Sequence, residues 1–223
     1  MQAWRGTTSH FNVSTPMNMV VFSVMGGAIV IQTAVSVAVA VALWRQPFDD
    51  RAMGWALRLG MMLTIAGAMT GPLMTRPTAT QLADARAGGR MTIVGAHSIG
   101  GPDGGPGLPV TGWSREYGDV RVAHFVGLHA IQALTLVAVG VGRLRRAPAV
   151  RVRMVLAATA SYASLFGLLL WQALRGQSVA APDSAALTAF AIWASATIVG
   201  IAISTRHVSR EELPWMTNHR SFR

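Results

Sequence analysis

Five apolar stretches, each long enough to cross a lipid bilayer, constrain this chain more than any other feature. A membrane-spanning helix needs about 20 mostly apolar residues, and lipid offers no hydrogen-bond partner for an unpaired backbone, so such stretches fold as helices. The sequence therefore predicts an all-α integral membrane protein, with one membrane domain over residues 1–223. The five transmembrane helices are expected at about residues 18–44, 52–74, 120–142, 154–174 and 185–205.

Composition agrees with this class. Of the 223 residues, 52% are hydrophobic and 13% are charged, and the mean hydropathy is +0.41, which is too apolar for an ordinary soluble domain. A net charge of +10 is compatible with nucleic-acid binding, but all 19 basic residues are arginines and most lie between the apolar stretches. We therefore expect the lipid bilayer as a partner and no nucleic acid. The absence of cysteine excludes disulfides and thiolate metal sites.

The arginines also predict how the helices are oriented. Short cytoplasmic loops are enriched in arginine and lysine, and the segment between the third and fourth predicted spans carries five arginines: Arg143, Arg145, Arg146, Arg151 and Arg153. This segment is therefore expected in the cytoplasm. With five spans, the N-terminus then lies outside and the C-terminus lies in the cytoplasm.

A long connection rich in Gly and Pro, residues 75–119, joins the second and third predicted spans and is expected on the extracytoplasmic side. Loops longer than about 12 to 15 residues usually have a function or carry structure of their own. Residues 78–87 predict a short helix capped by Thr78, and residues 91–94 predict a short extended piece. Residues 100–109, with five glycines and three prolines, exclude regular structure.

The second predicted span ends in a GxxxG step made by Gly67 and Gly71. Two small residues four apart on one helix face allow another helix to approach closely, backbone against backbone. We expect such a contact at this step.

Three of the six histidines lie in the loop or in the helix that follows it: His97, His124 and His129. At about 100° per residue, His124 and His129 point about 140° apart on a helix, with Gln132 between them. The opposite side of this helix is apolar. Polar groups at that depth in a membrane are expected to face the bundle interior or a wet cavity.

Three interpretations of these histidines remain open. In the first, His124 and His129 donate to backbone carbonyls of the Gly/Pro loop and dock it onto the bundle. Gln132 would complete this network, and the loop-docking residues are expected to include Arg121, Trp113 and Asp119.

In the second interpretation, the histidines bind a transition metal or haem. Imidazole suits zinc, copper and iron, and the cofactor-binding residues would be His97, His124, His129 and Gln132, with Asp103, Asp119 or water completing a metal site. No HxxxH or HExxH spacing is present. Two axial haem ligands would require His10 or His97 opposite the helix.

In the third interpretation, His, Asp, Arg and Trp113 form an enzyme site or a small-molecule site under a loop lid. No nucleophile elbow, P-loop or dinucleotide motif is present. All nine acidic residues lie outside the predicted spans, which argues against a proton-coupled transporter.

The pattern GGPDGGPGLPxxGWS followed by GDxRxxHFxGLHAxQ, at residues 100–114 and 118–132, resembles that of an uncharacterised group of bacterial multi-pass membrane proteins. The resemblance covers about an eighth of the chain. It implies a protein of the bacterial cytoplasmic (inner) membrane, and it implies nothing about substrate.

The expected function is a small membrane component that binds a metal or haem through His97, His124 and His129 at the extracytoplasmic face, for redox chemistry or metal handling. The alternative is a structural or partner-binding subunit without a cofactor, whose loop is a cap on the bundle. Its partner would be another membrane subunit or a second copy of the chain.

Overall fold

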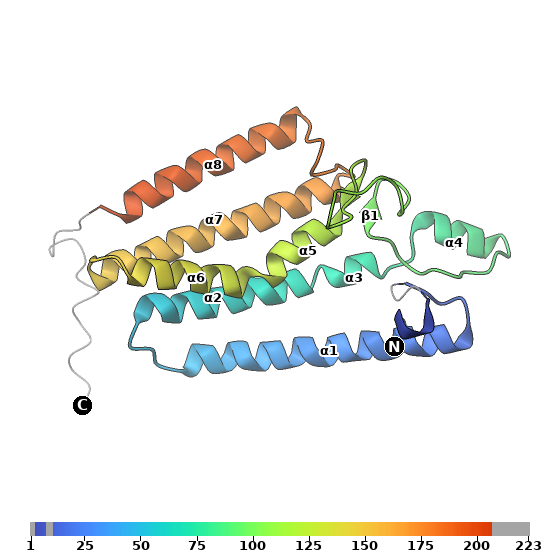
Figure 1. Ribbon diagram of the computed structural model, residues 1–223, viewed down its shortest axis with the longest axis horizontal. Helices are drawn as coiled ribbons and strands as arrows, with labels where there is room; N and C mark the ends of the chain where they lie inside the picture. The colour runs from blue at the N-terminus through green and yellow to red at the C-terminus, as the bar shows by residue number, and fades with distance from the viewer. Residues whose placement is uncertain (1–2, 8–10, 207–223) are drawn as a thin grey trace.

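The computed structural model describes residues 3–7 and 11–206 and is mostly helical (Figure 1). The N-terminal segment holds a short 3-10 helix, Ala3–Arg5. The α-helices are α1 (Pro16–Arg45), α2 (Arg51–Ala68), α3 (Gly71–Met74), α4 (Ala79–Arg86), α5 (Val120–Leu128), α6 (Ala130–Gly142), α7 (Pro148–Leu174) and α8 (Ser184–Ser204).

Several of these helices are long and apolar enough to cross a membrane. Within the described residues, four stretches qualify by length and hydropathy: Pro16–Arg45, Arg51–Arg86, Pro148–Leu174 and Ser184–Ser204. Helices α5 and α6 qualify only together, as a pair bent by 46°, and counting them as one span gives a fifth. The apolar helices thus fit a lipid bilayer environment.

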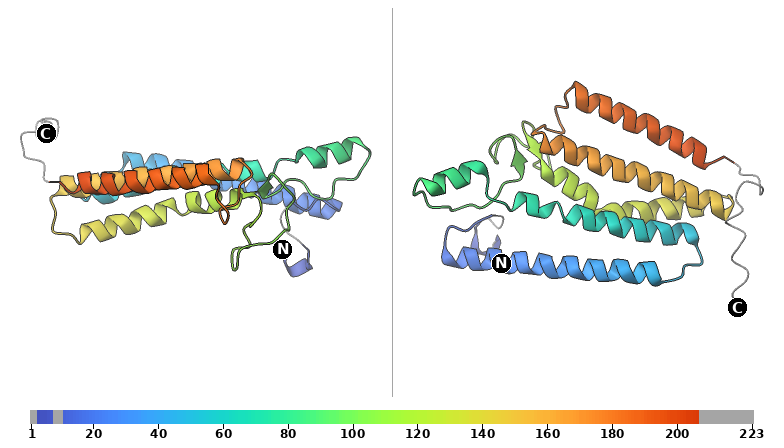
Figure 2. Two further views of the ribbon diagram at one scale, coloured as in Figure 1. Left: turned by 90° about the horizontal axis from the view of Figure 1, so that it is seen from above. Right: turned by 180° about the vertical axis from the view of Figure 1, so that it is seen from behind.

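The centre of the bundle is formed by α2, the α5–α6 pair and α7, while α1 lies against α2 and α8 lies against α7 (Figure 1). Seen from above, α1, α2, α7 and α8 lie near one layer, with α5 and α6 displaced to one side of it (Figure 2). The buried core contains mostly small side chains, which let the helices approach closely: Ala52, Ala56, Leu134, Ala138 and Val155.

Two predicted spans are interrupted rather than continuous. The second stops at Ala68 and resumes as the short helix α3, because Pro72 has no N–H to bond the carbonyl of Ala68 and its ring clashes with that carbonyl. The third is broken at His129, where α5 ends and α6 begins. The helices α1, α7 and α8 match the other three predicted ranges closely, except that α7 begins at Pro148, six residues early.

The long loop carries more structure than its composition predicts. The expected short helix is confirmed as α4, and a reciprocal capping box joins Thr78 and Gln81 at its start. The sequence did not predict the two-residue strands β1 (Ser98–Ile99) and β2 (Gly118–Asp119), which pair antiparallel and tie the loop to the beginning of α5. The loop therefore lies packed at one end of the bundle (Figure 1).

Candidate functional site

The site begins with a direct backbone contact between α2 and α5. A Cβ atom placed on Gly67 would lie 2.4 Å from the carbonyl carbon of Gly127, and one on Gly127 would lie 2.4 Å from the Cα of Gly67. Two turns earlier on α2, a Cβ on Gly60 would lie 2.8 Å from the Cα of Ile131. The close approach expected at the GxxxG step is therefore confirmed at Gly67, whereas Gly71 faces the imidazole of His124.

The side chain of Thr64 fills the break between α5 and α6. Its hydroxyl accepts a hydrogen bond from the backbone N–H of Ile131 at 3.2 Å and donates to the carbonyl of Leu128 at 3.4 Å. An interrupted helix leaves such groups without intrahelical partners, and in a membrane they need substitutes. One threonine of α2 thus supplies both partners and stabilises the bend.

We expect Thr64→Val to destabilise this bend, because valine keeps the shape of threonine but offers neither donor nor acceptor. Interhelical hydrogen bonds in membranes are worth roughly 1 kcal/mol, so the expected loss of stability is about that size. The measurement is the midpoint of thermal unfolding in detergent. The matched control is Thr188→Val on α8, where the exposed hydroxyl donates to the carbonyl of Ser184 in its own helix and to no other described residue. Equal midpoints for the two variants would contradict the role given to Thr64.

His124, in the middle of α5, joins this helix to the end of α2. Its Nδ1 lies 2.9 Å from the carbonyl oxygen of Gly67 and 3.0 Å from the hydroxyl of Thr70. A carbonyl can only accept, so Nδ1 carries the hydrogen, and the Thr70 hydroxyl donates to the same carbonyl. This half-buried histidine therefore bonds a carbonyl of α2, and the prediction that it bonds a carbonyl of the Gly/Pro loop was wrong.

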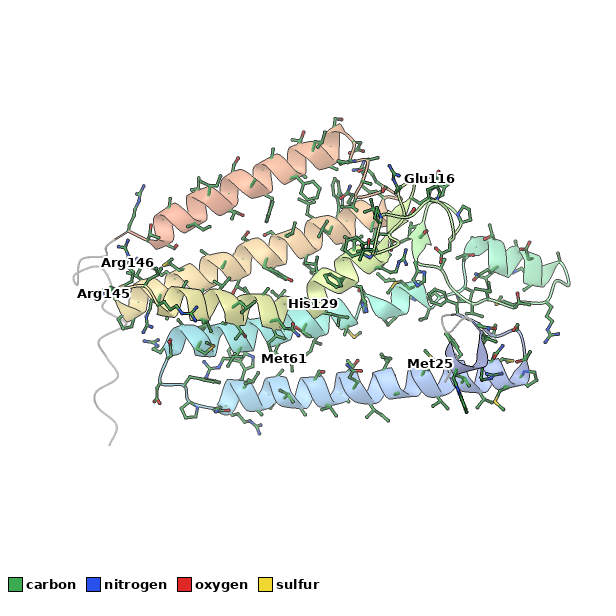
Figure 3. The ribbon with its side chains drawn as sticks, in the orientation of Figure 1. Met25, Met61, Glu116, His129, Arg145 and Arg146 are labelled. Atoms are coloured by element: carbon green, nitrogen blue, oxygen red, sulfur yellow. The ribbon has the colours of Figure 1, made fainter. Side chains whose placement is uncertain are left out.

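His129 lies at the break itself and is exposed (Figure 3). Its Nδ1–H donates to the carbonyl of Phe125 at 2.8 Å, one turn earlier in the same helix, and not to the loop as predicted. The imidazole lies 4.1 Å from the ring of Phe125, which in turn makes an edge contact with Trp113 at 5.8 Å. With Nδ1 occupied, Nε2 is the ring nitrogen that remains available to a ligand.

The face that His129 shares with Gln132 points away from the bundle. Four exposed residues at helical spacing make up this outer α5–α6 face: Phe125, His129, Gln132 and Leu136. The predicted orientation, with the polar groups toward the bundle, was therefore wrong for His129 and Gln132. The apolar side of the helix packs inward instead, since Ala123, Ala130 and Leu134 are buried.

His97 and Asp103 form a second polar group, within the loop. Asp103 accepts hydrogen bonds from the backbone N–H groups of His97 and Ser98, both at 2.7 Å, and its carboxylate lies 3.2 Å from Nδ1 of His97. Burial acts to raise the pKa of Asp103, but the hydrogen bonds from His97 and Ser98 outweigh it and leave the pKa below its ordinary value of 3.8. Asp103 thus closes the turn that precedes residues 104–109.

The lowered pKa predicts an acid-sensitive loop. A carboxyl group whose pKa is depressed by folding contributes stability above its unfolded pKa and loses it as the pH falls through the folded pKa. The contribution of Asp103 should therefore be complete above about pH 4 and disappear progressively below 3.8. Hydrogen exchange at the amides of His97 and Ser98 should accelerate in that range beyond its intrinsic rate. Asp103→Asn should exchange fast already at pH 5, and equal protection in this variant would contradict the prediction.

The loop is held on the bundle by Asp119 and Arg121. The buried carboxylate of Asp119 accepts from the backbone N–H of Ser114 at 2.8 Å and from the guanidinium of Arg121 at 2.6 Å. Arg121 also donates to the carbonyl of Gly112 at 2.8 Å. The indole of Trp113 packs on the apolar cluster of Val122, Ala123 and Leu169. The three residues expected to dock the loop thus all contact it or the bundle beneath it.

The three histidines do not form one metal site. Within residues 3–7 and 11–206, no group of three or more His, Asp or Glu side chains is arranged to hold a metal ion. His97 belongs to the Asp103 turn, His124 to the contact with α2, and His129 to the outer α5–α6 face. His10, the other residue considered as a haem ligand, lies outside the described residues.

Thr64 and Thr70 are site residues that reasoning from the sequence missed. Thr64 recurs with Gly60, Gly67 and Gly71 at helical spacing, which keeps small residues near one face of the second predicted span, and Thr70 lies next to Gly71, just after α2 ends at Ala68. This spacing indicates a helix against which the backbone of another helix can pack closely. It does not say that a threonine hydroxyl will enter a helix break.

No family model, no curated protein and no solved structure matches this chain. The class defined by the fold is a mostly helical protein with membrane-compatible helices.

Proposed function

We propose that this chain is a partner-binding subunit of a membrane assembly, and that its outer α5–α6 face (Phe125, His129, Gln132 and Leu136) is the contact surface. One observation carries the proposal. Two polar side chains, His129 and Gln132, are exposed on an otherwise apolar face at the middle of a helix pair of membrane-spanning length.

The depth of this face makes lipid a poor neighbour for it. His129 lies nine residues after the start of α5, which is about 13 Å along the helix at 1.5 Å per residue. A polar side chain at such a depth is costly unless it finds a partner. No described residue forms a hydrogen bond with Nε2 of His129 or with the side-chain amide of Gln132. A helix with matching polar groups would satisfy both and bury Phe125 and Leu136, which are 49% and 71% exposed.

The proposal includes the five-span arrangement, with α5 and α6 as one bent span. In it, the N-terminus and the long loop lie outside the bacterial cytoplasmic membrane, and the arginine-rich α6–α7 connection lies in the cytoplasm. The arginines support this orientation. The contact surface then lies in the outer half of the membrane, close to the loop.

A second candidate function, binding of haem or a transition metal, rests on the hydrogen bond of His129. Histidine ligands usually donate their other ring N–H to a carbonyl or carboxylate, which fixes the ring. The bond from Nδ1 to Phe125 does this and leaves Nε2 for the metal, and Phe125 and Trp113 offer apolar surface to a porphyrin. Among the described residues, His129 alone would bind the metal. Any further ligand would come from outside them.

Crosslinking in membranes tests the first candidate, and the lack of native cysteine allows single-cysteine reporters. A Leu136→Cys reporter on the outer α5–α6 face should give an adduct of discrete mass with a cysteine- or amine-directed crosslinker. Twice the mass of the chain would identify a second copy, and another mass a different subunit. A Leu187→Cys reporter on α8, which is 56% exposed, should give no such adduct.

Adding His129→Leu and Gln132→Leu to the Leu136→Cys reporter separates a contact surface from a lipid-facing one. The face becomes fully apolar, so the adduct should decrease severalfold while the fold persists. An unchanged adduct, or equal adducts from both reporters, would contradict the proposal. The second candidate requires a Soret band or about one metal per chain that His129→Ala loses and His97→Ala retains. A colourless, metal-free protein from a preparation supplied with both would exclude it.

A further inference from the structure

The end of the bundle opposite the loop carries a concentrated positive charge. Nine arginines and two aspartates of the described chain lie there, in or beside the α1–α2 turn, the α6–α7 turn, the start of α7 and the end of α8 (Figures 1 and 3): Arg45, Arg51, Arg58, Arg143, Arg145, Arg146, Arg151, Arg153, Arg206, Asp49 and Asp50. We call this the arginine-rich end. Its formal net charge is +7, from nine positive and two negative groups.

Most of this charge is not neutralised by the residues that the structure describes. Among the described residues, the only ion pair at this end joins Arg151 to Asp50, at 3.4 Å. Arg153 donates to the backbone carbonyl of Arg206. The side chains of Arg143, Arg145 and Arg146 are exposed, and none has an ion pair or hydrogen bond within the part of the chain that the structure describes.

These three arginines directly precede the start of α7, which adds to their positive potential. The first turn of a helix carries the positive end of the helix dipole. In α7 this dipole, rather than free backbone N–H groups, adds to the potential, because Pro148 has no N–H and the N–H groups of Val150 and Arg151 bond the carbonyl of Ala147. The α7 helix has no acidic residue in its first turn and no side-chain cap. An anion near Ala147 would therefore meet both the guanidinium groups and the helix N-terminus.

Aromatic side chains place this end at a membrane interface. Trp44 and Trp55 contact each other edge to face at 5.8 Å, near the end of α1 and the start of α2. Arg58 extends back along them and donates to the carbonyls of Leu43 and Gln46. Tryptophan concentrates at the level of lipid headgroups, so the arginines of the α6–α7 turn lie at or just beyond the phosphates.

We propose that the arginine-rich end binds the phosphate of an anionic phospholipid, held by Arg143, Arg145 and Arg146 at the start of α7. Guanidinium groups bind phosphate oxygens in bidentate geometry, and clusters of basic residues next to membrane helices bind anionic lipids. The other end of the bundle is a weaker candidate. It holds seven described arginines with five acidic residues, and Asp119 and Asp183 there already pair with Arg121 and Arg175.

The test compares two triple variants that remove the same charge. Arg143→Gln/Arg145→Gln/Arg146→Gln changes the arginine-rich end, and Arg76→Gln/Arg86→Gln/Arg115→Gln changes exposed arginines at the loop end. Each protein is titrated in detergent with phosphatidylglycerol or phosphatidylcholine. Retained lipid is measured by native mass spectrometry, and stabilisation by the shift in the unfolding midpoint.

The expected result is that phosphatidylglycerol is retained and stabilises the unmodified protein, and that the first triple weakens this binding about tenfold or more. The loop-end triple should bind as the unmodified protein does. Equal weakening in both triples would mean that binding follows total charge alone and would overturn the proposal. The same follows if phosphatidylcholine binds equally well, or if inorganic phosphate alone gives the full stabilisation. Unfolding midpoints without added lipid confirm that both triples fold.

Discussion

Replacing Gly67 with alanine is expected to force α2 and α5 apart and to lower the free energy of unfolding by about 3 kcal/mol. The added Cβ would lie 2.4 Å from the carbonyl carbon and 2.6 Å from the Cα of Gly127. Both are backbone atoms, so no side chain can rotate away. Overpacking a buried site typically costs about 1 to 3 kcal/mol, and a contact between two backbones belongs at the upper end of that range.

Gly140→Ala in α6 is the matched control, because nothing lies within 4 Å of a Cβ placed there. It should leave stability unchanged or raise it by up to about 1 kcal/mol, since alanine favours a helix over glycine. The measurement is the midpoint of thermal unfolding in one detergent. If Gly67→Ala and Gly140→Ala had the same midpoint, the packing of α5 against α2 described above would be wrong.

The double variant Gly67→Ala/Gly127→Ala sharpens this test. Each single change already separates the same two helices, so the second should add much less than its own single effect. The separation would also lengthen the bond from His124 to the carbonyl of Gly67 and the contacts of Thr64 in the helix break. Additive effects would indicate that the two glycines lie in separate environments.

The sequence predicted the long apolar helices well because hydropathy is a local property of each stretch. The ranges of α1, α7 and α8, the cap of α4 by Thr78 and the close approach at Gly67 all follow from residues within one or two turns. The interruption after Ala68 could also have been predicted, since Pro72 stands four residues later.

The break at His129 could not be predicted in this way. The residues around it form an ordinary helical pattern, and the groups that stabilise the bend belong to α2. The outward direction of His129 and Gln132 was missed for a related reason. The rule that polar groups face the bundle assumes that the chain is its own complete bundle, whereas here the small apolar side of the helix packs inward against α2 and α7.

The loop histidine illustrates a third limit. His97 could share a ligand site with His124 only if the loop folded back over α5. The sequence pattern does not indicate the direction in which the loop folds. The carboxylate of Asp103, six residues later, accepts a hydrogen bond from the backbone N–H of His97 and lies 3.2 Å from Nδ1 of its imidazole. A local turn therefore explains this histidine without a metal.

Asp119→Ala is expected to be about as damaging as Gly67→Ala. It should lower the free energy of unfolding by about 3 kcal/mol and loosen the loop. The carboxylate begins α5 as its N-cap through the N–H of Arg121 at 3.0 Å, and a cap is worth about 1 kcal/mol. It also bonds the N–H of Ser114 and pairs with the guanidinium of Arg121. Its side chain is fully buried, so alanine would leave donors unsatisfied, at roughly 1 to 3 kcal/mol for a buried one.

Asp183→Ala provides an unusually close control. Asp183 is likewise the N-cap of a long helix, through the N–H of Ala186 at 2.7 Å, and likewise pairs with an arginine, Arg175, at 2.7 Å. The two sites differ in burial, since the side chains of Asp183 and Arg175 are 38% and 37% exposed. Water can replace the lost contacts there, and exposed ion pairs contribute little. The loss should therefore be much smaller.

Unfolding midpoints and limited proteolysis of the loop distinguish the two variants. Asp119→Ala should lower the midpoint and expose residues 104–117 to protease, while Asp183→Ala should leave the loop resistant. Asp119→Asn should fall between them, because asparagine still caps a helix but does not neutralise Arg121. Equal behaviour of the two alanine variants would show that burial under the loop adds nothing to this cap. The loop would then be a separate, loosely held segment.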